Sequence, residues 1–146
     1  MRKRLVTAAL LSMVFMVFMS VSVIAASAPV SVTGNILAES ITNTAKGARI
    51  YKAIVRFKAG TVASFDSLTQ ILISQPGSYP VRFEIVGPDG GLRAYYDLMV
   101  SATSADWTHS QLTHWRSVSF DTAGTYQFVV RVNRRSVAAF PISASN

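Results

Sequence analysis

Both tryptophans and both histidines of the 146-residue chain fall in one short stretch, DWTHSQLTHW, at residues 106–115. Imidazole nitrogens bind zinc and copper, and paired indoles form platforms for sugars or apolar partners. His109 and His114 are five residues apart. They therefore lie on opposite faces of a strand, or roughly 140° apart on a helix. Both can bind one ion only if the chain turns between them, for which Ser110 and Gln111 are suited.

The two tryptophans raise the same geometric question. Trp107 and Trp115 are eight residues apart, which on one extended strand is roughly 26 Å along the same face. A chain reversal near Ser110 would bring the indoles together. Two interpretations follow: the tryptophans pack at the open end of a domain, or this stretch is a ligand-binding loop. The residues of that candidate site are Trp107, His109, His114 and Trp115. We expect packing and no bound metal.

A second candidate surface is basic. Six residues are predicted to point outward from strands: Lys52, Arg56, Lys58, Arg82, Arg93 and Arg131. If their strands are neighbours, these side chains form a mildly positive sheet face that can meet acidic glycans, anionic lipid or a protein partner. A solvated outer face is the ordinary explanation for such a pattern.

Sequence motifs of the common enzyme classes are absent. The chain has no G-x-S-x-G, no H-E-x-x-H, no glycine-rich phosphate loop followed by a helix, and no cysteine. We therefore predict a protein that is not an enzyme and needs no cofactor. A hydrolase with an unrecognised set of His and acidic residues is the remotest alternative.

The N-terminus has the three parts of a secretory leader. A basic MRKR precedes an uncharged apolar run at residues 5–24, and small residues follow at 25–28. We predict a signal peptide over residues 1–26 and a single domain over residues 27–146. The apolar run is also long enough to span a bilayer, so an uncleaved anchor is the alternative.

Charge and cysteine content narrow the function further. The net charge of +7 includes three basic residues of the leader, so the exported part carries +4, which is weak support for binding nucleic acid. Without cysteine there is no disulfide, and about 120 residues must be held by one core. An exported chain without disulfides is more typical of a bacterial envelope than of animal secreted modules.

The exported part alternates apolar and polar residues with a period of two, as half-buried strands do. The alternation is clear at residues 50–58, 79–86, 92–101 and 126–132, and a first strand is expected near 35–41. The turn sequences GPDGG at 87–91 and NRR at 133–135 predict two β-hairpins. Residues 60–67 are left open as a loop or one short helix. The fold class is all-β, with about seven to eight short strands.

The segment FDTAGTYQFVVRVNRRSVAAFPI, residues 120–142, resembles the closing hairpin of small bacterial immunoglobulin-like sandwiches. The spacing of Asp121, Gly124, Tyr126 and Phe128 resembles the tyrosine corner of that fold. The resemblance implies an immunoglobulin-like antiparallel β-sandwich in which the Tyr126 hydroxyl bonds upstream backbone and Phe128 stands where antibody domains have a cysteine. It implies no catalytic residues.

These features predict an exported binding or assembly module of the bacterial cell envelope, periplasmic or extracellular. The expected partner is another envelope protein, or a second copy joined through strand edges. We expect no nucleic acid partner, and membrane contact only if the leader is uncleaved. The alternative is a small metal- or carbohydrate-binding protein that uses residues 106–115.

Overall fold

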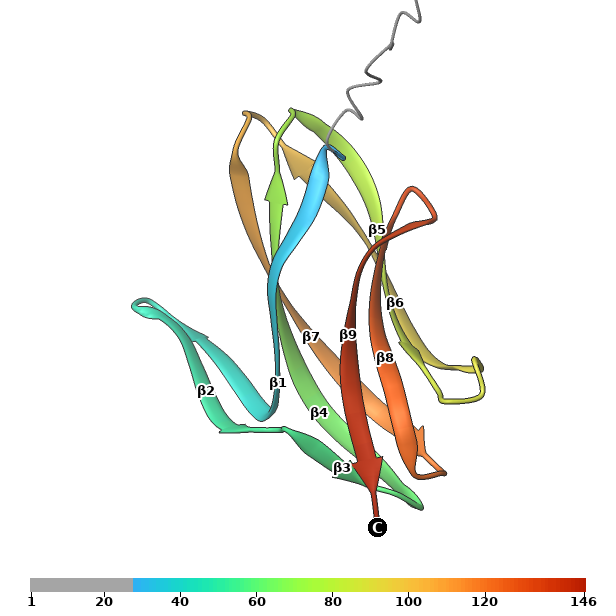
Figure 1. Cartoon of the computed structure of the whole chain (residues 1–146). Coiled ribbons are helices and arrows are strands. Elements are labelled where there is room, and N and C mark those ends of the chain that lie inside the picture. Colours follow the sequence, from blue (N-terminus) through green and yellow to red (C-terminus); the bar gives the residue numbers. More distant parts are fainter. Residues whose placement is uncertain (1–27) are drawn as a thin grey trace, which may run out of the picture.

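The computed structural model describes residues 28–146, so the predicted signal peptide at 1–26 lies outside the described residues. Nine strands form two sheets packed face to face as a sandwich (Figure 1). One sheet has the order β2-β1-β4-β7, and the other the order β3-β9-β8-β5-β6. The predicted all-β sandwich is confirmed, with nine strands instead of seven or eight.

The strands of the four-stranded sheet are β1 (Val30–Thr44), β2 (Gly47–Ala53), β4 (Thr61–Ile73) and β7 (Trp107–Phe120). Those of the five-stranded sheet are β3 (Arg56–Lys58), β9 (Arg135–Ser145), β8 (Gly124–Val132), β5 (Gly77–Val86) and β6 (Leu92–Ala102). Among the described residues, the hydrophobic core runs from Val30 to Ala144 and draws on both sheets. Among residues 28–146, no helix is long and apolar enough to cross a membrane.

Aromatic side chains fill one end of the core. Phe57 stacks on Phe120 with ring centroids 4.0 Å apart. Trp115 meets Phe128 of the opposite sheet edge-on at 5.9 Å. Because aromatic side chains bury the largest apolar areas, this end supplies much of the hydrophobic stabilisation.

Both predicted hairpins and the tyrosine corner are confirmed. Residues 87–91 connect β5 to β6, and Asn133 and Arg134 turn between β8 and β9 with φ angles of 50° and 68°. Two successive positive φ angles are typical of the type I′ turn that suits a two-residue hairpin. The buried Tyr126 donates its hydroxyl to the Thr122 carbonyl at 3.1 Å, which ties the turn after β7 to β8.

The prediction of one strand over residues 50–58 is wrong. β2 ends at Ala53 in one sheet, and β3 starts at Arg56 in the other. The chain crosses between the sheets in the two intervening residues, where Val55 is 91 % exposed. The alternation therefore does not mark one buried face: Phe57 enters the core, while Tyr51 is 66 % exposed.

The open question about residues 60–67 has a simple answer: residues 61–67 are the first half of β4, which β7 accompanies along its whole length. β1 pairs with β4 over its first half and with β2 over its second half. The β1–β2 hairpin therefore extends beyond the sandwich as an arm (Figure 1). At its base the Ile41 N–H donates to the Asp66 carboxylate at 2.7 Å, and Ile41 is buried.

Candidate functional site

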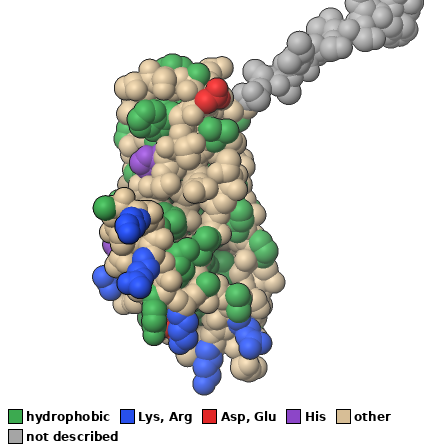
Figure 2. Space-filling model, turned by 90° about the vertical axis from the view of Figure 1, so that its left-hand side faces the viewer, with side chains coloured by type: hydrophobic (Ala, Val, Ile, Leu, Met, Phe, Trp, Pro, Cys, Tyr) green, Lys and Arg blue, Asp and Glu red, His purple; other side chains and the backbone are tan. Residues whose placement is uncertain are grey.

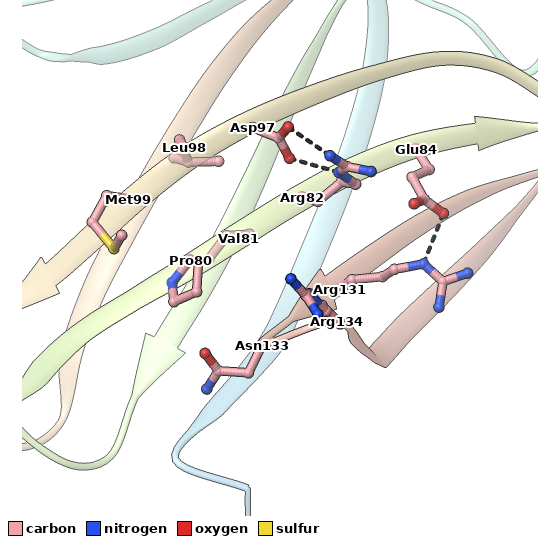
Figure 3. Close-up of a pocket in the computed structure, with 10 residues that line it drawn as sticks. All are labelled: Pro80, Val81, Arg82, Glu84, Asp97, Leu98, Met99, Arg131, Asn133 and Arg134. Atoms are coloured by element: carbon pink, nitrogen blue, oxygen red, sulfur yellow. Dashed lines mark hydrogen bonds and ion pairs between the residues drawn. The ribbon is translucent and has the colours of Figure 1, made fainter.

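A hollow of about 800 Å³ lies on the outer face of the five-stranded sheet. Val81 is buried in the core, so its neighbours Pro80 and Arg82 on β5 point to the outer face. Figure 3 shows the side chains around the hollow, which come from three adjacent parts of the sheet. The polar and flexible ones are Arg82 and Glu84 of β5, Asp97 and Met99 of β6, Arg131 of β8, and Asn133 and Arg134 of the next turn.

Two ion pairs order the base of this hollow. Arg82 lies opposite both Asp97 and Arg131 in the sheet register. It donates Nε and Nη2 to the two carboxylate oxygens of Asp97 at 2.6 and 2.8 Å. Arg131 donates Nε to Glu84 at 2.8 Å. Each carboxylate therefore offsets one of two arginines that would otherwise repel each other across neighbouring strands.

The hydrogen-bonded pair of Arg82 and Asp97 shifts the pKa of each partner in the direction that favours its charged form. The hydrogen bonds from Arg82 lower the pKa of the Asp97 carboxyl, and partial desolvation opposes this shift. The same hydrogen bonds raise the pKa of Arg82. Arg134 forms no ion pair within the part of the chain that the structure describes, so the hollow has a net positive charge.

The rim of the hollow is the edge strand β6, which pairs with β5 alone among the described strands. Four large apolar side chains of β6 are 42 to 62 % exposed: Leu92, Tyr95, Tyr96 and Met99. The Arg82 guanidinium lies 4.6 Å from the centre of the Tyr95 ring, a cation–π distance. Tyr, Met and Arg are the residue types enriched in the cores of protein interfaces.

The predicted basic face is only partly formed. Arg82 and Arg131 are side by side, as their outward positions predicted. Arg56 pairs with Ser143 of β9, which lies opposite Thr125 of β8. Thr125 is six residues from Arg131, so roughly 20 Å of strand separates the two arginines. Lys58 lies beyond Arg56 on β3, and Lys52 belongs to the β1–β2 hairpin, where it pairs with Glu39 at 2.6 Å.

Arg93 does not point outward to the basic face, contrary to the prediction. Its side chain is 16 % exposed and lies between two turns, with Nη2 3.0 Å from both oxygens of Asp89 and Nε 3.4 Å from Asp121. The Gly91 N–H and the Arg93 guanidinium lower the pKa of Asp89. Since these carboxylates satisfy its charge locally, Arg93 joins the β5–β6 and β7–β8 turns and is a structural residue.

The interpretation of residues 106–115 as a connecting loop is wrong, because residues 107–115 are part of β7. The chain does not reverse near Ser110, which answers the question that the tryptophan spacing left open: Trp107 lies opposite Ile73, and Trp115 lies opposite Phe65, eight residues along β4. The indoles are therefore far apart. Trp115 is 4 % exposed and packed as expected, whereas Trp107 is 43 % exposed.

The two histidines lie on opposite faces of β7, as their odd spacing requires of a strand. His114 is on the outer face, with Nδ1 2.6 Å from Asp66 Oδ1. His109 is half-buried on the inner face, 3.2 Å from the Gln111 side-chain oxygen. Within residues 28–146, no three His, Cys, Asp or Glu side chains are grouped to hold a metal ion.

Comparisons with known proteins identify no family for this chain. No protein-family model and no curated protein matches the chain. The chain is similar to an immunoglobulin-like protein from Pseudomonas aeruginosa, at 14 % identity and a TM-score of 0.44, over 82 % of this chain and 98 % of that one. A CARDB domain from Pyrococcus furiosus, in complex with di-metal ions, matches at 13 % identity and a TM-score of 0.38, over 77 % and 93 %.

A third similar structure is the alkylpurine DNA glycosylase AlkC from Pseudomonas fluorescens, bound to DNA containing an abasic site analogue. It matches at 14 % identity and a TM-score of 0.48, over 82 % of this chain. This chain spans 31 % of that protein. The two packed sheets and the tyrosine corner of the present chain form the all-β sandwich that the resemblance of its closing hairpin implies.

Sequence reasoning did not select the apolar residues of β6. The alternation at residues 92–101 placed Tyr95, Asp97 and Met99 on the outward face, together with Arg93. The outward face of a strand usually carries short polar residues. A tyrosine and a methionine on that face are the signal that would have identified the apolar residues of β6.

Proposed function

We propose that this chain is a non-enzymatic binding and assembly module of the bacterial cell envelope, and that it takes up a strand of a partner protein along β6. The partner is another envelope protein or a second copy of this chain. The proposal rests on one observation: the edge strand β6 exposes four large apolar side chains, of which Met99 lines the charged hollow and Tyr95 lies on the same outward face.

The backbone of an edge strand supports this mode of binding. β6 is eleven residues long and contains no proline or lysine, which natural proteins use to block such edges. A partner strand can form main-chain hydrogen bonds along this edge, while pockets beside it select the side chains. Tyr95 and Met99 supply apolar contact, and Arg134 supplies positive charge at the rim of the hollow.

Export is the part of the proposal that rests on the leader. The basic, apolar and small-residue segments of residues 1–28 are typical of a secretory signal peptide. A cysteine-free sandwich that needs no disulfide is compatible with a periplasmic or extracellular location.

Site-specific photo-crosslinking in cells that make the protein tests the proposal. Tyr95 is replaced by p-benzoylphenylalanine in the full chain, and a second chain carries the same group at Ser110 on β7, the edge of the other sheet. We expect a covalent product from position 95, to another envelope protein or to a second copy, and none from position 110. No product, or equal products from both positions, would overturn the proposal.

A charge variant provides an independent check. Met99→Lys places a cation on the apolar part of β6 and should reduce the product from position 95 at least tenfold, because an unpaired charge is costly to bury in an interface. Thr108→Lys on β7 is the matched control and should leave the product unchanged. Since both positions are exposed, neither variant should alter the near-ultraviolet circular dichroism of the fold.

A further inference from the structure

The β1–β2 hairpin and the crossing segment after it form a strongly basic part of the molecule. Between Glu39 and Asp66 the chain has five basic residues and no acidic one. Lys52 pairs with Glu39. The other four are exposed and form no ion pair within residues 28–146: Lys46, Arg49, Arg56 and Lys58.

The same segment exposes apolar side chains. Ile41 and Ile50 face each other across the hairpin, and the buried Ile41 places that face toward the sandwich. The opposite face carries Arg49 and Tyr51 and points away from the sandwich, because side chains alternate along a strand. Tyr51 is 66 % exposed. Val55 in the crossing segment is 91 % exposed.

The cations and apolar side chains share one side of the molecule. Figure 2 shows the Lys and Arg side chains of this side gathered over its lower half, with hydrophobic side chains among them. The Asp66 carboxylate near this surface is nearly buried, and the Ile41 N–H and His114 both contact it. The exposed carboxylate of Glu39 offsets Lys52 alone, so the other four cations set a positive potential here.

We infer that this basic hairpin surface, Lys46, Arg49, Tyr51, Val55, Arg56 and Lys58, docks on a bilayer that contains anionic phospholipid. A soluble polyanion would use the positive charges alone and would leave Tyr51 and Val55 in water. A bilayer interface satisfies both features, because the headgroups attract the cations while aromatic and aliphatic side chains enter the boundary with the acyl chains. This contact belongs to the folded domain and is independent of the leader and of the β6 edge.

Vesicle flotation tests the inference. Residues 27–146 are used, because they contain every core residue that the structure describes and lack the apolar leader that would itself insert into lipid. We expect binding to vesicles of phosphatidylcholine mixed with phosphatidylglycerol, and little binding to phosphatidylcholine alone. Binding should weaken as salt concentration rises, because salt screens exposed charges. Equal binding to both vesicles, or to neither, overturns the inference.

Two sets of variants locate the contact. Each neutralised cation near an anionic surface is expected to cost about fivefold in binding. The double variant Lys46→Gln, Arg49→Gln should therefore weaken binding roughly 25-fold. Arg134→Gln, Arg135→Gln removes the same charge from the exposed β8–β9 turn, on the other side of the molecule from the hairpin (Figure 1), and should change binding less than twofold. Equal losses in the two double variants would mean attraction by net charge, and would overturn the inference.

A charge-neutral variant separates lipid from a soluble polyanion. Tyr51→Ser, Val55→Ser keeps every cation and removes the exposed apolar groups. It should reduce vesicle binding at least tenfold and leave binding to soluble polyglutamate unchanged, because burial of these side chains contributes only at the bilayer interface. Unchanged vesicle binding in this variant would overturn the assignment to a bilayer and indicate an acidic polymer as the occupant.

Discussion

β6 and β7 are the edge strands on the same side of the sandwich, and they contact each other between the sheets. Their backbones offer the same unpaired hydrogen-bonding groups, but their side chains differ. β7 turns Trp115, Val118 and Phe120 into the core. β6 leaves Tyr95 and Met99 exposed on the outside. The difference indicates that β7 mainly stabilises the fold, and that β6 is the edge suited to a partner.

The largest expected effect tests the role of β7. Trp115→Ala removes an indole that packs on Phe65 and Phe128 and donates Nε1–H to Ser67 at 2.9 Å. It should lower the free energy of unfolding by about 3 to 5 kcal/mol, measured by urea denaturation. Trp107→Ala is the control on the same strand and should cost less than about 1 kcal/mol, because Trp107 is 43 % exposed and is not part of the core cluster. Equal losses of stability in the two variants would contradict the conclusion that β7 stabilises the core through Trp115.

A smaller loss of stability is expected at the tyrosine corner, where Asp121 connects the end of β7 to the start of β6. The Tyr126 hydroxyl is 3.0 Å from Asp121, whose carboxylate is also 3.4 Å from Arg93 at the start of β6. Tyr126→Phe keeps the buried ring and removes the hydroxyl, so it should cost about 1 to 2 kcal/mol in the same denaturation experiment. No measurable loss would mean that the corner does not contribute to holding the two strands.

The smallest expected change in stability comes from the ion pair between Arg82 of β5 and Asp97 of β6. Since Arg82 lowers the pKa of Asp97 in the folded protein, the pair contributes to stability above the ordinary carboxyl pKa of about 4, and this contribution is lost as pH falls through the lowered value. Titration of the Asp97 carboxyl carbon by NMR should show the lowered pKa. In the Arg82→Gln variant the pKa should return toward the ordinary value. An unchanged titration would show that the pair is not formed in solution.

Local sequence patterns predicted the two hairpins of the five-stranded sheet well, but not its short strand β3. Tyr126, Phe128, Val130 and Val132 share the buried face of β8, and Asn133 supplies a residue that tolerates a positive φ, so the closing hairpin and its tyrosine corner follow from the sequence. The outward positions of Arg82 and Arg131 follow from the same alternation. That the two arginines would be neighbours required the strand order, which no local pattern contains.

The four-stranded sheet was predicted poorly because part of its inner face is polar. Ser67 and Thr69 are fully buried on β4, where the alternation rule expects apolar residues. Hydrogen bonds make this possible: Ser67 accepts from the Trp115 indole, and Thr69 bonds the Asn35 side chain at 3.0 Å. Such partners come from other strands, so the segments around residues 60–67 and 106–115 gave no clear strand pattern.

β1 belongs to two structures at once, because its first half is part of the sandwich and its second half is part of the projecting hairpin. Any pull on the hairpin along β1 is therefore transmitted to the ladder between β1 and β4. That ladder runs from Val30 to Ala38, parallel to the pull. All hydrogen bonds of this ladder resist the sliding of β1 along β4 at the same time, so they do not open one after another. The arm is thus fixed to the domain by the geometry that best withstands mechanical force.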